Sequence, residues 1–141
     1  MHFASAKACL CAVVVVAVTG LAAGCGHSDV SLGSRPKDED SARSLAQVVA
    51  DRAHCDGFED YRLDARDNWV FTCQKSDRMF GIRADADPSN RAGLIGKLRT
   101  EKQPYKAGHA FLVYEFQHAP GRPDPATDLK NFPGTLSLPD S

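Results

Sequence analysis

The sequence predicts a small α+β domain in which helices pack on one face of a mainly antiparallel sheet. Three observations predict this class: an amphipathic helical segment comes first, short segments with strand-like alternation follow it, and a second helical segment precedes a strongly apolar last strand. The expected order is α-β-β-β-α-β, with one extra short strand as a further option. Short turns between neighbouring strands imply antiparallel pairing, and helices on one face of such a sheet give a two-layer sandwich.

The first helix is expected to start at Ser41, whose side chain is a good N-cap. Apolar residues then recur at the spacing of one helical stripe: Leu45, Val49 and Ala53. Gly57 favours the end of this helix, because glycine readily takes the left-handed conformation that follows a helix. Cys55 would then lie at the helix C-terminus.

Three strand candidates follow the helix. Residues 58–63 form a weak and acidic one, whereas apolar residues alternate along 68–74 and 78–84. The side chains expected on one face are Trp69, Phe71 and Cys73 in the first of these two, and Phe80, Ile82 and Ala84 in the second. Residues 75–77 (KSD) are expected to form a hairpin turn between them.

Asp87 and Pro88 have the residue types of an N-cap and a first helical residue. The second helix is expected to run to about residue 99. Its buried residues are expected to be Ala92, Ile95 and Leu98. Gly93 and Gly96 lower its helix propensity and would allow close packing on the sheet.

Residues 110–116 (AFLVYEF) hold one charged residue, Glu115, and are the best candidate for a central strand. Gly108 and His109 can turn a short hairpin from Tyr105 into this strand.

The globular domain is expected over residues 41–116, as one unit. Residues 25–40 are polar and poor in large apolar residues, so a flexible tether is expected there. Residues 117–141 contain five prolines and are expected to be extended or disordered. Phe132 and Leu136 offer contacts that would attach part of this tail to the domain.

The N-terminus has the pattern of a processing signal. Lys7 precedes 17 residues, 8–24, that carry no charged side chain, as in the charged and apolar regions of a signal peptide. A transmembrane helix needs about 20 apolar residues, so a membrane-spanning anchor is an open but short alternative.

The last residues of this segment, LAAGC at 21–25, resemble the lipobox of bacterial lipoproteins, although Ala22 stands where a large aliphatic residue is usual. The resemblance implies that residues 1–24 are removed by cleavage between Gly24 and Cys25. It also implies a diacylglycerol on the Cys25 thiol and lipid anchoring at the outer face of the cell membrane. An ordinary secretory signal with a chance cysteine is the other alternative.

The five cysteines are an odd number, which calls for an explanation in an exported chain. Under the lipobox interpretation, Cys9 and Cys11 leave with the signal peptide and Cys25 carries lipid, so Cys55 and Cys73 remain as a pair. An oxidising compartment favours a disulfide between them, and closing their loop would contribute about 3 kcal/mol. A metal site is the alternative, but close ligand pairs such as CxxC or HxxxH are missing from the sequence.

The order of elements also resembles that of small actinobacterial lipoproteins of unknown function. The features that carry the resemblance are a helix ending at Cys55, a strand cysteine at Cys73, a strand ending near Ala84, a helix over residues 89–99, and the run Tyr105, Gly108 and Phe111. The resemblance covers residues 42–116 and supplies no catalytic residues.

Two acidic patterns are candidates for calcium binding. The first comprises Asp56, Glu59, Asp60, Asp64 and Asp67. Arg62 and Arg66 lie among them and favour a solvated, self-compensated surface.

The second acidic pattern, Asp85-x-Asp87-x-Ser89, is similar to the start of an EF-hand loop. Asn90 and Gly96 stand where that loop needs glycine and glutamate, so a helix cap is the preferred interpretation of Asp87.

Catalysis is not expected. The sequence has no GxSxG elbow and no dinucleotide glycine motif or P-loop, and His109 is interpreted as a turn residue. An enzyme would need a pocket on which His109, Tyr114 or carboxylates converge. Trp69 is expected to pack against the disulfide and the first helix.

The formal net charge is −1, and it becomes −2 without residues 1–24 because Lys7 is the only charged side chain there. Charges of both signs are mixed, so no nucleic-acid partner is expected. The predicted function is a non-catalytic binding module at the cell envelope, anchored to membrane lipid through Cys25, with an unidentified envelope protein or ligand as partner and with no cofactor or metal. The exposed sheet face and the Pro-rich tail are the candidate surfaces. Alternatives are a surface lipoprotein of phage defence or superinfection exclusion, and a small envelope enzyme.

Overall fold

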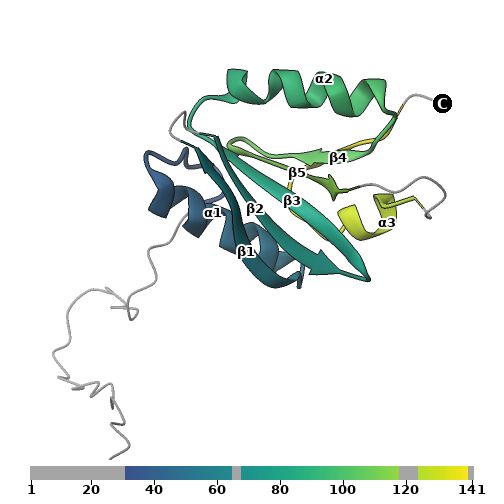
Figure 1. Cartoon of the computed structure of the whole chain (residues 1–141), viewed down its shortest axis with the longest axis horizontal. Coiled ribbons are helices and arrows are strands. Elements are labelled where there is room, and N and C mark those ends of the chain that lie inside the picture. Colours follow the sequence, from purple (N-terminus) through teal and green to yellow (C-terminus); the bar gives the residue numbers. More distant parts are fainter. Residues whose placement is uncertain (1–30, 65–67, 118–123, 140–141) are drawn as a thin grey trace, which may run out of the picture.

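The computed structural model describes residues 31–64, 68–117 and 124–139. These residues form a six-stranded antiparallel sheet with the order β1-β2-β3-β5-β4-β6, and the helices lie above and below it (Figure 1). The strands are β1 (Asp56–Asp64), β2 (Asn68–Lys75), β3 (Arg78–Asp85), β4 (Tyr105–Ala107), β5 (Phe111–Phe116) and β6 (Thr135–Ser137). The helices are α1 (Glu39–Arg52), α2 (Ala92–Thr100) and the short α3 (Ala126–Leu129), and a 3₁₀ turn, η1 (Pro88–Arg91), leads into α2.

The predicted α+β class, the antiparallel pairing and the order of the predicted elements are confirmed. The expectation that the helices share one face is wrong. α1 packs on the face that carries Phe71 and Val113, whereas α2 packs through Leu98 against Leu112 on the opposite face. β5 explains this arrangement, because its successive side chains point to opposite faces and are apolar on both, so both faces need cover.

The N-cap of α1 is Asp38, three positions before the expected Ser41. Asp38 Oδ1 accepts a hydrogen bond from Ser41 N at 2.8 Å, and Asp38 N donates to Ser41 Oγ at 3.1 Å. This is a reciprocal capping box in which Ser41 holds the third helical position. Ser41 is therefore part of the predicted cap, but as its third helical residue, and Asp38 is the N-cap.

The apolar stripe of α1 is confirmed, since its predicted members are fully buried: Leu45, Val49 and Ala53. The predicted end signal is wrong. His54, with φ of 52°, takes the left-handed conformation after the helix, and Gly57 lies in β1 instead.

The segment before α1 lies against the domain. Leu32 packs against the core, Pro36 is buried, and Arg35 Nε donates to His109 Nε2 at 3.4 Å. A flexible tether over residues 25–40 is therefore wrong for its second half, because local polarity hid these contacts with distant residues. Residues 25–30 lie outside the described residues.

β2 and β3 form the predicted hairpin. Lys75 pairs with Arg78, and the two residues between them, Ser76 and Asp77, have φ of 50° and 61°. This left-handed pair matches the twist of antiparallel strands, as in type I′ turns. The optional extra strand is also present, because β4 pairs with β5.

Asp87 caps the η1–α2 segment as predicted, since its Oδ1 accepts from Ser89 N at 2.9 Å. Leu98 is buried as expected, Ile95 is half-buried, and Ala92 is exposed, contrary to prediction. A side chain at Gly93 would meet only open space. The same is true of Gly96. The expectation that these two glycines allow close packing of α2 on the sheet is therefore wrong.

The expectation of an extended or disordered tail is wrong for residues 124–139, which include α3 and β6. Phe132 is buried in the core and Leu136 packs against it, so the attachment through these two residues is confirmed. Pro125 and Pro133 lie just outside α3, where proline is tolerated because no internal helix hydrogen bond is lost. The number of prolines alone could not distinguish prolines that flank a short helix from prolines in a disordered segment.

Buried charges hold this C-terminal segment to the sheet. Arg78 Nη1 lies 3.5 Å from Glu115 Oε2 on β5, and Arg78 Nε lies 3.7 Å from Asp128 Oδ2 in α3. The ammonium group of Lys106 in β4 donates to the carbonyl of Lys130 at 3.1 Å and to that of Phe132. These contacts provide partners for carbonyl groups that the end of α3 leaves open.

Candidate functional site

The predicted disulfide is present. Cys55 and Cys73 are bonded, with Cα atoms 5.7 Å apart, and both are buried in the main core. The bond connects the residue just before β1 to β2, directly after the end of α1. Trp69 lies in the same buried cluster as the two cysteines and the α1 stripe, as the sequence predicted.

The lipidation site, Cys25, and the cleavage position at Gly24 lie outside the described residues, so both stay predictions. In the part of the chain that the structure describes, no helix combines the length and the apolar character needed to cross a membrane.

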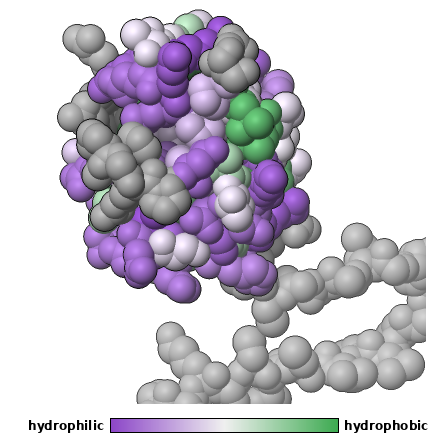
Figure 2. All heavy atoms as spheres, turned by 90° about the vertical axis from the view of Figure 1, so that its right-hand side faces the viewer, coloured by the Kyte–Doolittle hydropathy of each residue, from purple (hydrophilic) through white to green (hydrophobic). Residues whose placement is uncertain are grey.

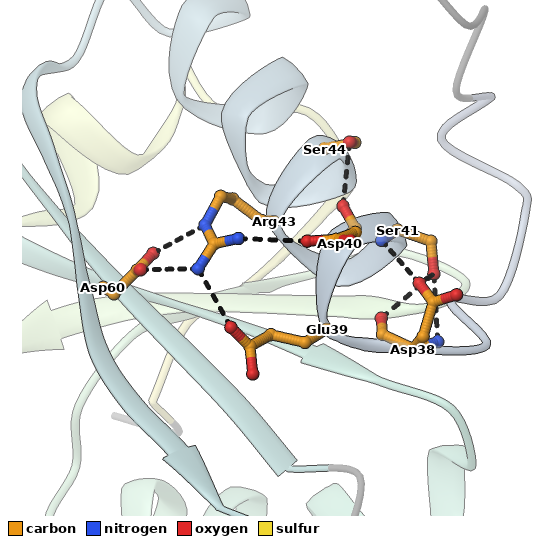
Figure 3. A network of polar contacts seen from close by, with 7 residues as sticks. All are labelled: Asp38, Glu39, Asp40, Ser41, Arg43, Ser44 and Asp60. Atoms are coloured by element: carbon orange, nitrogen blue, oxygen red, sulfur yellow. Dashed lines mark hydrogen bonds and ion pairs between the residues drawn. The ribbon is translucent and has the colours of Figure 1, made fainter.

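Among the acidic residues of β1, Asp60 has a defined partner. Arg43 of α1 donates to it through Nη2 at 2.6 Å and Nε at 3.0 Å, and Figure 3 shows the same guanidinium bonded to Glu39 and Asp40. The hydrogen bond from Arg43 lowers the pKa of Asp60 below its usual value. The cation that compensates Asp60 is thus Arg43 of α1. The local sequence pattern indicates only the nearby Arg62 and Arg66 and could not identify it.

The two carboxyls of the second acidic pattern have different surroundings. Asp85 is fully buried, its Oδ1 lies 2.6 Å from Arg83 Nε, and burial raises its pKa. Asp87 is exposed and caps η1. Within the described residues, no group of three or more His, Cys, Asp and Glu side chains is placed to hold a metal ion.

His109 and Tyr114 do not come together. His109 is exposed in the turn between β4 and β5, and Arg91 donates to three carbonyls of this turn: Gly108, His109 and Phe111. Tyr114 lies further along β5, opposite Tyr105 of β4. The histidine is therefore part of a clamped turn, as the sequence interpretation had it.

An aromatic groove lies between α2 and the sheet face on the same side. Its cavity volume is about 400 Å³, and its apolar lining consists of Tyr61, Leu94, Leu98, Tyr114 and Phe116. Its polar lining residues are Lys97, Glu101, Gln103, Glu115 and Gln117. Glu115 is buried and paired with Arg78, so the other four form the rim.

Tyr61 is the residue that extends this groove across the sheet. Its ring meets that of Phe116 edge-on, with centroids 4.5 Å apart, although β2 and β3 lie between β1 and β5. The side chain is still 53% exposed, and only Leu138 among the large hydrophobic residues described is similarly open. The register of β1 shifts at this point, between Asp60 and Arg62. Contacts place the two side chains on opposite sides of the sheet: Asp60 bonds to Arg43 of α1, and Tyr61 contacts Phe116 in the groove.

The rim of the aromatic groove has little net charge. Lys97 Nζ and Glu101 Oε1 are 3.7 Å apart on successive turns of α2, so they compensate each other. Aromatic rings beside amide and paired charged groups can bind a partner that offers an apolar surface together with hydrogen-bonding groups. Sequence reasoning missed this site because the strand that carries Tyr61 was classed as weak and acidic.

No protein-family model, no curated protein and no solved structure matches the chain.

Proposed function

We propose that the protein is exported, anchored through a lipid on Cys25 to the outer face of the cell membrane, and acts there as a non-catalytic binding module. The observation that supports this location is the segment LAAGC at residues 21–25, which ends an uncharged run. The Cys55–Cys73 disulfide supports it, because disulfides persist mainly in oxidising compartments.

The aromatic groove is the proposed binding surface. Tyr61 supports this role, because a large aromatic ring in contact with a second ring but half open to solvent offers apolar contact area with few rotatable bonds. Binding rather than catalysis is favoured because His109 lies in the clamped β4–β5 turn, away from the groove that contains Tyr114.

The anchor would keep the domain close to the membrane. Residues from 31 onward lie against the domain through Leu32 and Arg35, so the connecting stretch is residues 25–30. Six residues span at most about 20 Å. A partner of this module would therefore lie within the envelope, near the membrane surface.

The anchoring is tested by the intact mass of the protein extracted from membranes, with and without reductant. We expect loss of residues 1–24, an added diacylglycerol-type mass, and a gain of two hydrogen atoms when the reductant converts the disulfide to two thiols. The matched control is Cys25→Ser, which should leave the disulfide intact and abolish the lipid and the membrane attachment. A full-length or unlipidated mass would contradict the proposal.

The binding surface is tested by placing a photo-cross-linking phenylalanine derivative at Tyr61 in living cells. The control position is Ser44, which is exposed on α1, on the other side of the sheet. We expect a discrete cross-linked product from position 61 and none from position 44. Products of the same pattern from both positions, or none from either, would contradict a role for the groove.

A further inference from the structure

A second cavity lies at the C-terminal end of α2, between that end and the last residues of the described chain. Its volume is about 420 Å³, which is in the range of small-molecule sites. The side chains that define its chemistry are Arg99, Lys102, Tyr105 and Leu138. We call it the α2-end cavity.

Two cationic side chains line the α2-end cavity and form no ion pair with the described residues. Arg99 and Lys102 are both exposed, no carboxylate of the described residues lines the cavity, and within those residues neither cation forms an ion pair. Lys97, one turn earlier on the same helix, is by contrast paired with Glu101. Among the described residues, the cavity therefore has two positive charges and no carboxylate in its lining.

Lys102 occupies an unfavourable backbone position. It follows α2 with φ of 52°, Lys102 N donates to Arg99 O at 3.1 Å, and Gln103 N donates to Leu98 O at 2.8 Å. These are the bonds of a Schellman helix end, whose left-handed residue is most often glycine. A lysine here is disfavoured by its backbone. His54 ends α1 in the same way, so the conformation supports a role for the Lys102 side chain only together with the cavity beside it.

The rest of the cavity lining combines apolar residues, Tyr105, Leu138 and Pro139, with the polar residues Gln103 and Ser137. Leu138 is 59% exposed, and Tyr105 is buried beneath. Figure 2, which views the end of the molecule at the right of Figure 1, shows a mainly hydrophilic surface with one small apolar area. An exposed leucine beside two cations that form no ion pair with the described residues fits a ligand with an anionic group and an apolar group.

The position of the cavity bears on the source of that ligand. Arg35, near the proposed anchor, contacts His109, and Arg91 at the start of α2 clamps the same turn. The cavity lies at the other end of α2, away from the residues where the described chain begins. This placement favours a free amphiphile over a headgroup of the anchoring membrane.

We propose that the α2-end cavity binds a small, soluble amphiphilic anion, with a phosphate or carboxylate group on Arg99 and Lys102 and a short alkyl group against Leu138. This site is separate from the aromatic groove and does not depend on it.

The test is isothermal titration calorimetry of the full chain in phosphatidylcholine nanodiscs, with empty nanodiscs as the blank. The probes are hexyl phosphate, inorganic phosphate and 1-hexanol. We expect hexyl phosphate to bind at least tenfold more tightly than either of the other two. Equal affinity for the two phosphates, tighter binding of hexanol, or no binding of hexyl phosphate would overturn the proposal.

Three variants locate the site. Lys102→Gly should weaken hexyl phosphate binding at least tenfold while the protein stays folded, because glycine suits the backbone there. Leu138→Ser should remove the preference for hexyl phosphate over inorganic phosphate. Arg52→Gln, which removes an exposed cation of α1 outside both cavities, should change neither. Unchanged affinity in Lys102→Gly would overturn the assignment.

Two further arms exclude other occupants. Asp140, outside the described residues, follows Pro139 of the cavity lining, and Asp140→Asn should leave the affinity unchanged. Binding that appears only in this variant would mean that the chain fills the cavity itself. Sedimentation with phosphatidylglycerol vesicles should not depend on Lys102; a dependence without hexyl phosphate binding would assign the cavity to a lipid headgroup and overturn the proposal.

Discussion

Single carboxyl groups give this domain two opposing responses to pH. Arg43 lowers the pKa of Asp60 through a hydrogen bond, so Asp60 stabilises the fold above its unfolded pKa and this contribution is lost as the pH falls. Burial raises the pKa of Asp85, so its contribution has the other sign: it is present at low pH and is lost as the pH rises through the folded pKa. The net acid response depends on both.

Arg43→Gln should lower the free energy of unfolding at pH 7 more than at pH 2. The reason is that the variant returns the pKa of Asp60 toward its ordinary value of 3.8, which matters only where Asp60 is ionised. Urea unfolding at the two pH values measures this difference. Arg52→Gln at the end of the same helix is the control, and equal losses at both pH values for Arg43→Gln would contradict the prediction.

Gly81→Ala should destabilise the protein by about 1–3 kcal/mol, as expected of an overpacked site. The added Cβ would lie 2.7 Å from Tyr114 Cζ and would displace a ring that lines the aromatic groove. Gly93→Ala in α2 is the control, because its Cβ meets open space and the change should stabilise the helix by up to about 1 kcal/mol. Thermal or urea unfolding measures both, and a shift of the same sign in the two variants would be inconsistent with this packing.

At the scale of elements, the C-terminal segment behaves as part of the core rather than as an appendage. The ring centroid of Phe132 lies 5.1 Å from that of Phe80 in β3, and β6 extends the sheet beyond β4. α3 is held to β3 through Asp128 and Arg78. Residues 124–139 therefore cover the part of the α1-side face that α1 itself does not reach.

Phe132→Ala should cost about 3–5 kcal/mol of unfolding free energy, the usual range for a large aromatic side chain removed from a core. Leu138→Ala, in the same segment but largely exposed, should change stability by less than about 0.5 kcal/mol. Urea unfolding of the two variants beside the wild type provides the comparison. A small loss in Phe132→Ala would mean that the segment is not needed for the stability of the domain.

The types of the helices and strands could be predicted from the local sequence, but the elements that cover each face of the sheet could not. Alternation in β2 and β3, the cap at Asp87 and the hairpin turn at Ser76 are local signals, and each was predicted correctly. α3 and β6 are stable because of contacts with β3 and β4, which no local pattern encodes. The two-sided apolar character of β5 was visible in AFLVYEF and could have predicted helices on both faces.

For the whole molecule, the disulfide was predictable and the groove was not. With Cys9 and Cys11 in the predicted signal peptide and Cys25 assigned to lipid, one pair of cysteines remained. The disulfide could therefore be predicted without knowing the fold. Tyr61 and Phe116 meet only because β1 and β5 belong to one sheet and the ring of Tyr61 leans over the strands between them. Strand order had to be known before these residues could be grouped.

The last prediction separates the roles of the cysteines. The double variant Cys55→Ala/Cys73→Ala should lower the free energy of unfolding by about 2–5 kcal/mol, because its unfolded chain is no longer constrained by the cross-link. Reductant should lower the stability of the wild type similarly and leave that of the variant unchanged, as measured by urea unfolding. Cys25→Ser should show the reverse pattern, with normal unfolding and loss of membrane attachment. If the double variant released the protein from the membrane while Cys25→Ser did not, the cross-link rather than the lipid would hold the protein in place, and the assignment of Cys25 as the anchor would be wrong.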